Sequence, residues 1–250
     1  MKCKVMGIVN VTPDSFSDGG QFFKPEEAIR RAKNLIAEGA DIIDLGGEST
    51  RPGATPIPWE EEWFRIEPVL TGLRAFEQSE HSNIRTILSV DTYHPETAKR
   101  AIAAGAHIIN CVYAEPIPEM LKLLEGNDVE LVVPYRPGDE DFRRKTEDAS
   151  IVSRLYLDPM IGFGTTREED LGLLRSIPEL AKRGRVLVGA SRKRIVKKLV
   201  GEKSSVGKNI GGNVAIAIWA ALNGASVVRV HDVKETVQAI RVVESLRFKV

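Results

Sequence analysis

The sequence has 250 residues, and its 35 basic and 35 acidic side chains give a formal net charge of zero. Hydrophobic residues make up 42% and charged residues 28%, a balance that argues against disorder and against a basic nucleic-acid-binding arm. With only Cys3 and Cys111, a disulfide framework is excluded and a reducing compartment fits. No apolar run approaches the roughly 18 to 20 residues that span a membrane. We therefore expect a cytoplasmic protein without a nucleic-acid or membrane partner.

Eight short apolar runs alternate with helical patterns along the chain. The expected strands are residues 4–10, 41–46, 86–91, 107–110, 130–134, 154–158, 185–190 and 226–230. Each run is too short for a helix and too uniformly apolar for a strand with one face in water, which is typical of parallel sheets covered on both faces.

The clearest helical pattern begins at Pro25 and stops at Gly39, and residues 95–105 and 233–246 follow the same rules. Its apolar face is formed by Ile29, Ala32, Leu35 and Ile36. Residues 213–224 are apolar almost all round, which predicts burial in the core or a contact between two copies of the chain. The side chains concerned are Ala215, Ile216, Ile218, Trp219 and Leu222.

A weak internal repeat supports a parallel architecture. The segments GADIID at 39, GAHIIN at 105 and GASVVRV at 224 each place glycine where a helix must end, directly before a buried strand. Their spacings are near multiples of about 30 residues, the length of one strand-helix unit. Eight such units predict a (β/α)8 barrel in one domain over residues 1–250. The fifth helix should be short or irregular, because only the polar residues 135–152 are available for it.

Polar side chains follow most of the expected strands. They are Asn10, Asp44 with Glu48, Asp91, Asn110, Asp158, Ser191 with Lys193, and Arg229 with His231. In a parallel barrel these ends share one rim, where ligands bind. Capping of the following helices is the alternative for single residues, but arginine, lysine and histidine are poor caps, so the whole set favours a binding site.

Two long segments, residues 10–24 and 46–58, exceed the usual two to six residues between a strand and a helix. They combine glycine and proline with asparagine, aspartate, threonine and arginine, which is typical of a lid or a binding loop. A surface loop without function is the alternative.

The donors and acceptors of the strand ends indicate a ligand class. Asp91, Asp158, Asn110 and Lys193 would suit a flat heterocycle with one donor edge and one acceptor edge. Arg51, Arg229 and His231, with Asn10 and Thr50, would suit a phosphate or pyrophosphate. The oxygen atoms of Asn10, Asp14 and Asp18 are ligands that Mg²⁺ accepts alongside substrate phosphates.

Cys111 is expected to be a small buried residue, because nothing near it in the sequence would lower its pKa. His81, His94 and His107 have no partner nearby in the sequence and are expected to pack or to lie at the surface.

The motifs together resemble the dihydropteroate synthase family. The resemblance rests on GIVNVTPDSFSDGG (7–20), IIDLGGESTRPGA (42–54), SVDT (89–92), IIN (108–110), LDPMIGFG (157–164), ASRK (190–193) and RVHDVKET (229–236). It covers almost the whole chain. It implies a (β/α)8 barrel and a transferase that joins 6-hydroxymethyl-7,8-dihydropterin pyrophosphate to p-aminobenzoate, giving dihydropteroate and pyrophosphate.

The resemblance also implies residue roles. The pterin would be held by Asp91, Asn110, Asp158 and Lys193, and the pyrophosphate by Asn10, Thr50, Arg51, Arg229 and His231. Mg²⁺ would bind near Asn10, and Asp18 would help to order the closed site. The arylamine slot would be formed by Phe16, Thr50, Pro52 and Phe163, with Arg194 close by. The residues expected to act in catalysis are Asn10, Asp18, Arg51, Lys193, Arg229 and His231.

The sequence departs from the family pattern at Cys111, Met160, Thr165 and Arg194, and in its shortened fifth unit. Arg194 stands where the family has a serine that contacts the aminobenzoate carboxylate. Two alternatives therefore stay open. Arg194, with Arg136, could receive a phosphorylated ribofuranosyl-aminobenzene of the methanopterin pathway, or the chain could be a pterin-binding paralogue without catalysis.

Overall fold

The computed structural model describes residues 3–12, 24–50, 53–78, 86–136, 149–201 and 209–247. Its strands are β1 (Lys4–Asn10), β2 (Ile42–Gly46), β3 (Ile87–Asp91), β4 (Ile108–Asn110), β5 (Glu130–Pro134), β6 (Leu155–Asp158), β7 (Arg185–Val188) and β8 (Val227–Val230). Their order is that of a closed barrel, β1 through β8, and the pairs β2–β3, β3–β4, β6–β7, β7–β8 and β8–β1 are parallel. The expected (β/α)8 barrel is confirmed, and every strand lies within two residues of its predicted bounds.

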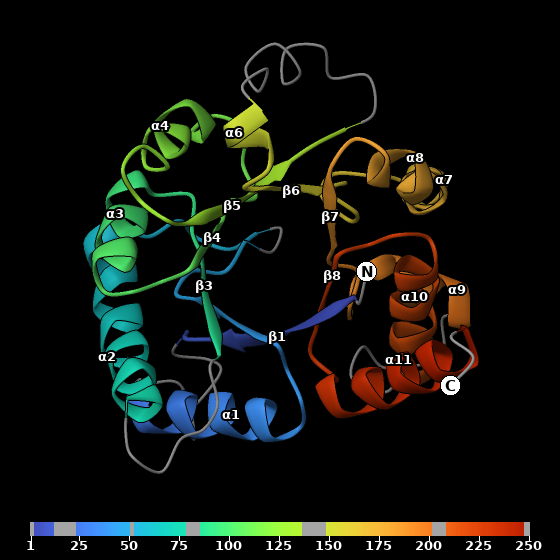
Figure 1. Cartoon of the computed structure of the whole chain (residues 1–250), viewed down its shortest axis with the longest axis horizontal. Coiled ribbons are helices and arrows are strands. Elements are labelled where there is room, and N and C mark those ends of the chain that lie inside the picture. The colour runs from blue at the N-terminus through green and yellow to red at the C-terminus, as the bar shows by residue number, and fades with distance from the viewer. Residues whose placement is uncertain are drawn as a thin grey trace. The chain divides into compact units, whose positions relative to one another are not determined.

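Helices follow the strands as a (β/α)8 architecture requires (Figure 1). They are α1 (Pro25–Ala37), α2 (Trp59–Glu77), α3 (Pro95–Ala103), α4 (Ile117–Lys122), α6 (Ala149–Val152), α7 (Arg167–Arg175), α8 (Ile177–Ala181), α9 (Arg194–Val200), α10 (Ile210–Leu222) and α11 (Val233–Arg247). In the part of the fifth connection that the structure describes, α6 has four residues, as the short and polar sequence predicts. No helix among the described residues is long and apolar enough to cross a membrane.

The chain divides into two compact units. Unit 1 contains Met1–Gly7, Glu38–Ala40 and Val132–Val250, and unit 2 contains Ile8–Ala37 and Asp41–Leu131. The expectation of one domain over residues 1–250 stays a prediction.

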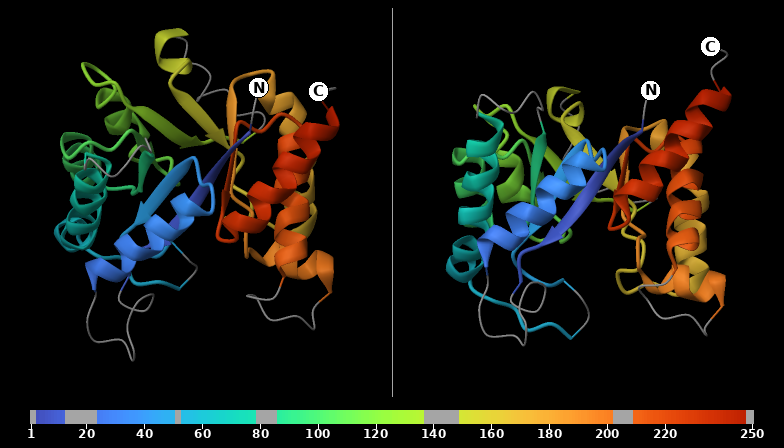
Figure 2. Two further views of the ribbon diagram at one scale, coloured as in Figure 1. Left: turned by 60° about the horizontal axis from the view of Figure 1, so that its bottom comes forward. Right: turned by 90° about the horizontal axis from the view of Figure 1, so that it is seen from below.

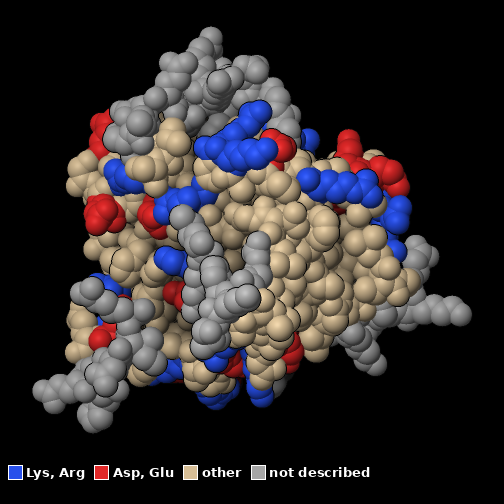
Figure 3. All heavy atoms as spheres, turned by 45° about the vertical axis from the view of Figure 1, so that its right-hand side comes forward, with Lys and Arg blue, Asp and Glu red and all other residues tan. Residues whose placement is uncertain are grey.

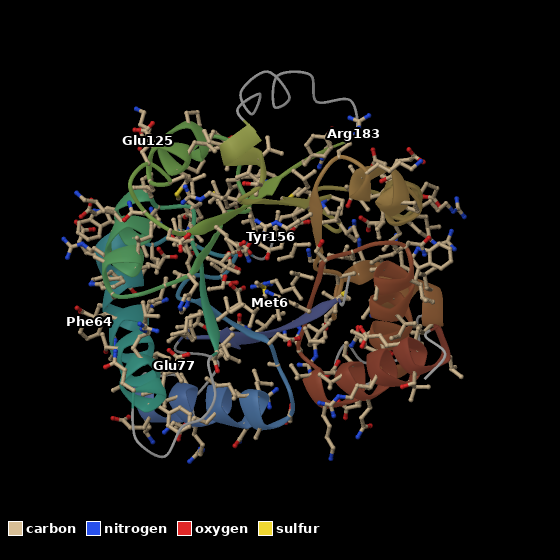
Figure 4. All side chains as sticks on the ribbon, in the orientation of Figure 1. Met6, Phe64, Glu77, Glu125, Tyr156 and Arg183 are labelled. Carbon is tan, nitrogen blue, oxygen red and sulfur yellow. The ribbon has the colours of Figure 1, made fainter. Side chains whose placement is uncertain are left out.

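In unit 2, α1 packs against α2, and α2 packs against α3 (Figure 1). The predicted face of α1 is buried at Ala32, Leu35 and Ile36. Ile29 is half-buried and contacts α2, where a Cβ added at Gly72 would lie 2.6 Å from its Cδ1 atom. The missing side chain at Gly72 therefore lets the two helices approach closely. Figure 4 shows Phe64 pointing away from this contact, and its side chain is exposed.

In unit 1, α10 packs against α9, α11 and β8 (Figure 2). A Cβ at Gly212 would lie 2.6 Å from Val200 Cγ1 and 2.9 Å from Val196 Cγ1, so the contact between α9 and α10 requires glycine there. On β1, Met6 is fully buried and points to the inner side of the strand (Figure 4).

The outer face of α10 is apolar and exposed. Trp219 is 49% exposed and Leu222 40% exposed, whereas Asn213, Ala217 and Ala220 on the opposite face are buried. Figure 3 turns this side of unit 1 forward and shows a broad area without charged side chains. Core packing therefore explains only one face of this helix.

The three glycines of the sequence repeat share one backbone conformation. Gly39, Gly105 and Gly224 have φ angles of 102°, 93° and 97°, in the region that side chains with a Cβ disfavour. Each follows a helix and precedes a strand, so the repeat marks the turn that reverses the chain between them.

We predict that Gly224→Ala lowers the free energy of unfolding by about 2 kcal/mol or more. Alanine would be strained at this φ, and its Cβ would lie 2.9 Å from Ala181 Cβ. The matched control is Gly211→Ala in α10, where a Cβ meets nothing within 4 Å, so this change should be neutral or stabilising by up to about 1 kcal/mol. Urea unfolding of both variants measures the difference. Equal effects would contradict the conformational explanation.

Candidate active site

Three strand ends of unit 2 lie in register. Gly46 of β2 faces Asp91 of β3, and Asp91 faces Asn110 of β4. A Cβ added at Gly46 would lie 3.7 Å from Asp91 Cβ, so this glycine leaves room beside the carboxylate. Asn10 ends β1 and is half-buried. The predicted residues Asn10, Asp91 and Asn110 are thus each at the carboxyl end of a strand.

A buried hydrogen-bond network holds Asn110. Its Nδ2 atom donates to Asp44 Oδ2 at 3.2 Å, and Ser89 Oγ donates to Asp44 Oδ1 at 2.5 Å. All three side chains are at most 1% exposed. The Oδ1 atom of Asn110 is buried and has no hydrogen-bond partner among the described residues. A buried acceptor without a donor is costly, so this oxygen is available to a donor from a ligand or from water.

A second polar cluster in unit 2 was not anticipated from the sequence. Tyr93 Oη donates to Glu48 Oε1 at 2.6 Å, and His94 Nε2 lies 3.1 Å from Glu48 Oε2. The Tyr93 ring also meets the Tyr113 ring edge to face, with centroids 4.9 Å apart. Burial and the Glu48 carboxylate raise the pKa of Tyr93. The polar role of His94 corrects the expectation of a packing or surface residue, because its partner lies 46 positions away.

This second cluster borders a cavity of about 320 Å³. Its lining is formed by Glu48, Ser49, Thr50, Ala54, Pro56, Tyr93, Tyr113, Glu115 and Pro116. The two carboxylates and two phenol rings of this lining suit a neutral or cationic group. Thr50, which was predicted to contact both pyrophosphate and arylamine, lies at this cavity.

Glu62 of α2 is a further buried carboxyl near the strand ends. Thr92 Oγ1 donates to Glu62 Oε2 at 2.6 Å, and the Glu62 side chain is 1% exposed. Burial raises the pKa of Glu62 from 4.5 to about 7, and the carboxylates of Glu48 and Asp91 act in the same direction. Glu62 therefore titrates close to neutral pH.

Unit 1 brings together Asp158, Lys193 and Arg229. Asp158 ends β6 and is 5% exposed. Burial raises the pKa of the Asp158 carboxyl, while Lys193, the Met160 N–H group and Arg229 act in the opposite direction. A carboxylate with little water around it binds a donor more strongly than an exposed one does. The three residues are thus close enough to interact within this unit, and their role in one binding site stays a prediction.

Lys193 also organises the segment that follows β6. Its Nζ atom donates to the Ile161 carbonyl at 2.7 Å and lies 4.2 Å from the centre of the Phe163 ring. Lys193 occupies the N-cap position of α9, but its side chain makes no capping hydrogen bond. Capping of α9 by the Lys193 side chain is therefore not the role of this residue, and its binding role stays a prediction.

Ser191 and His231 contact each other at the ends of β7 and β8. Ser191 Oγ lies 3.1 Å from His231 Nδ1. The neighbouring Asp232 carboxylate binds Arg192 Nη2 at 2.7 Å and Asn213 Nδ2 at 2.8 Å. Asn213 Oδ1 in turn accepts from the Arg192 N–H group at 2.9 Å. This network connects α10 with the loop that carries Lys193.

Three of the residues that depart from the family pattern, Cys111, Thr165 and Arg194, have defined contacts. Cys111 is fully buried and donates to the Tyr113 carbonyl at 3.3 Å, and burial raises its pKa to about 12. This confirms a packing residue rather than a nucleophile. Thr165 Oγ1 donates to the buried Asp170 carboxylate. Arg194 Nη2 donates to the Thr165 carbonyl.

Several predicted site residues lie outside the described part of the chain. They are Asp14, Phe16, Asp18, Arg51 and Pro52, together with most of the expected first loop. Among the described residues, no group of three or more His, Cys, Asp or Glu side chains could hold a metal ion. Of the three residues predicted to offer an oxygen ligand to Mg²⁺, Asn10 is the one that belongs to the described residues.

Comparisons with known proteins agree with the motif analysis. The family model described as "Pterin binding enzyme" matches residues 6–148 and 138–231. A dihydropteroate synthase of Escherichia coli (strain K12) is 37% identical, with 96% of this chain and 90% of the relative covered. One of Streptococcus pyogenes serotype M6 is 33% identical, with 97% and 95% covered.

Solved structures give the same result. A Xanthomonas albilineans dihydropteroate synthase with 4-aminobenzoic acid aligns with a TM-score of 0.86 and 40% identity, covering 100% of this chain and 95% of that one. A Burkholderia cenocepacia dihydropteroate synthase complexed with 7,8-dihydropteroate aligns with a TM-score of 0.83 and 32% identity, covering 98% and 92%.

We predict that Glu62 makes stability depend on pH. Since its pKa is raised on folding, its stabilising effect is complete below pH 4.5 and is lost as the pH rises to about 7. Glu62→Gln should remove this loss, so the variant should gain up to about 3 kcal/mol on the wild type between pH 5 and pH 7.5. Urea unfolding across that range measures the gain. Glu60→Gln, an exposed change in the same helix turn, is the control, and parallel curves for wild type and Glu62→Gln would refute the prediction.

Proposed function

Because the chain belongs to the pterin-binding enzymes and, among them, to the dihydropteroate synthase family, we propose that it condenses 6-hydroxymethyl-7,8-dihydropterin pyrophosphate with p-aminobenzoate. The products are 7,8-dihydropteroate and pyrophosphate, so the protein is a transferase of folate biosynthesis. Full-length similarity to dihydropteroate synthases, including one with 7,8-dihydropteroate bound, supports this function.

One observation carries the proposed pterin contacts. The buried Oδ1 acceptor of Asn110 has no partner among the described residues, and it sits at the end of β4 next to Asp91 in register. We propose that Asn110 and Asp91, with Asp158 and Lys193, bind the edges of the pterin ring. Carboxylates would accept from its amino and ring N–H groups, and the Lys193 ammonium would donate to its carbonyl or ring nitrogen.

We propose that Arg229 and His231 bind the pyrophosphate, together with Asn10, Thr50 and Arg51. When the bond between the pterin methylene carbon and the bridging oxygen breaks, the pyrophosphate leaves with the electron pair. Cations aimed at this leaving group stabilise the developing charge. The arylamine nitrogen then forms the new bond to the methylene carbon and loses a proton.

Mg²⁺ stays a prediction that the donor chemistry of Asn10 supports. An amide oxygen at a strand end suits a hard cation that takes one or two protein ligands besides substrate phosphates. The ion would supply charge neutralisation of the pyrophosphate. Asp18 is a further proposed contributor to the closed site, outside the described residues.

For the arylamine, we propose a slot formed by Phe163, Thr50, Phe16 and Pro52, with Arg194 close by. Phe163 is half-buried, so part of its ring can contact a substrate. Lys193 is a proposed pterin contact, and its ammonium group also lies over the ring of Phe163, a proposed arylamine contact. This one lysine therefore adjoins both proposed contacts.

The test is pyrophosphate release by the purified protein. Pterin pyrophosphate is supplied with p-aminobenzoate or with a phosphorylated ribofuranosyl-aminobenzene, with and without Mg²⁺. We expect Mg²⁺-dependent turnover with p-aminobenzoate. Turnover with the phosphorylated arylamine alone would move the protein to the methanopterin-type reaction. Pterin binding without any turnover would identify a non-catalytic paralogue.

We predict that Arg229→Ala lowers turnover by on the order of 100-fold, because it removes a cation that neutralises the departing charge. The control is Lys234→Ala. Lys234 is an exposed cation four positions after Val230, the last residue of β8, and its removal should leave turnover at the wild-type level. The assay is the same pyrophosphate release. Turnover near wild type in Arg229→Ala would remove this residue from the mechanism.

We also propose that the outer face of α10 contacts a second copy of the chain. The exposed side chains of Ile210, Trp219 and Leu222 on a helix without charged residues support a homodimer. We predict that the wild type is a dimer by light scattering and that Trp219→Glu is a monomer. A monomeric wild type would refute the proposal.

The cytoplasm stays the predicted location, and the two buried free cysteines agree with it.

A further inference from the structure

Three cationic side chains donate to alternate carbonyl groups of one short segment, Met160–Thr165 in unit 1. Lys193 Nζ donates to the Ile161 carbonyl at 2.7 Å, and Arg136 Nη2 donates to the Phe163 carbonyl at 3.1 Å. Arg194 Nη2 donates to the Thr165 carbonyl. The three donors come from different places: Arg136 follows β5, Lys193 precedes α9, and Arg194 begins α9.

The backbone of this segment needs such support. Met160, Gly162 and Gly164 have φ angles of 62°, 79° and 67°, so every second residue lies in the left-handed region. Met160 carries a Cβ there, and a residue of this kind persists in that conformation only when its surroundings enforce it. The left-handed residues alternate with the residues whose carbonyls bind the three cations.

The amide groups of the segment are also fixed. Asp158 Oδ1 accepts from the Met160 N–H group at 2.7 Å, and Asp170 Oδ1 accepts from the Gly162 N–H group at 2.7 Å. Anionic acceptors thus hold amide groups while cationic donors hold carbonyls. Side chains from outside the segment thus hold it together with its own Thr165 hydroxyl, which accepts from the Gly162 N–H group at 3.1 Å, and Phe163 lies within this network.

We propose that Arg136 and Arg194 are positioning residues that fix the Met160–Thr165 segment and thereby the Phe163 ring for the arylamine. This inference rests on the proposed function insofar as Phe163 lines the arylamine slot. Lys193 already contacts both the segment and the ring, so the two arginines complete the set at Phe163 and Thr165. Arg136 is the cleaner residue to test, because it is not among the contacts proposed for the pterin, the pyrophosphate or p-aminobenzoate.

The first measurement needs no substrate. Hydrogen exchange of a peptide that covers residues 159–166 is followed by mass spectrometry in the wild type, Arg136→Met and Arg136→Lys. We expect exchange in Arg136→Met to be roughly tenfold faster, the factor expected for one lost hydrogen bond to a charged donor. Lysine can still donate to the Phe163 carbonyl, so Arg136→Lys should restore most of the protection.

The matched control is Arg167→Met. Arg167 is an exposed arginine at the start of α7 that pairs with Glu168 and contacts no carbonyl of the segment in the described interactions. Its exchange over residues 159–166 should equal that of the wild type. Unchanged exchange in Arg136→Met would overturn the positioning role, whether or not the protein has activity.

The second measurement is steady-state kinetics. Arg136→Met should raise KM for p-aminobenzoate by roughly tenfold and leave KM for the pterin pyrophosphate within about twofold, and Arg136→Lys should reverse the change. Equal changes in both KM values would overturn the assignment to the arylamine. Absence of turnover in the wild type would instead refute the proposed function, while the exchange result would still decide whether Arg136 fixes the segment.

Discussion

Removal of water from the Asp158 carboxyl is the constraint around which unit 1 is organised. A buried carboxylate is costly unless cations and donors compensate it. Lys193, Arg229 and the Met160 N–H group supply that compensation, and burial still raises the pKa of the carboxyl. The positions of Lys193 and of the segment after β6 follow from this requirement. Lys193 then carries the constraint further, through the Ile161 carbonyl and the Phe163 ring.

The buried carboxyl groups of unit 2 accept hydrogen bonds from hydroxyl and amide groups. Asp44 accepts from the hydroxyl of Ser89 and from the amide of Asn110. Glu62 is satisfied by threonine hydroxyls and titrates near pH 7. The carboxylates of Glu48 and Asp91 add to the effect of burial on the pKa of Glu62. Asn110 is left with a buried acceptor that only a ligand or solvent can satisfy.

The strands and their turns could be predicted because their signals are local. Short apolar runs gave the barrel order, and Gly39, Gly105 and Gly224 mark chain reversals that need a positive φ. The identity of the polar strand ends was also readable from the sequence. The contact of Glu48 with His94 could not be, because the two residues are 46 positions apart in the sequence. The roles of Arg136 and Arg194 depend on a backbone conformation that no local pattern encodes.

The close contact between α9 and α10 has a mechanical consequence. Gly212 of α10 places only a hydrogen atom against the two valines of α9, so the helices pack closely. If one helix slid along the other, larger side chains would push them apart and leave a gap. Asn213, the next residue, accepts a hydrogen bond from the backbone N–H group of Arg192. Arg192 directly precedes Lys193, the lysine that contacts the ring of Phe163. One hydrogen bond and one peptide bond therefore separate α10 from that lysine, so a displacement of this helix would be passed to the lysine through very few atoms.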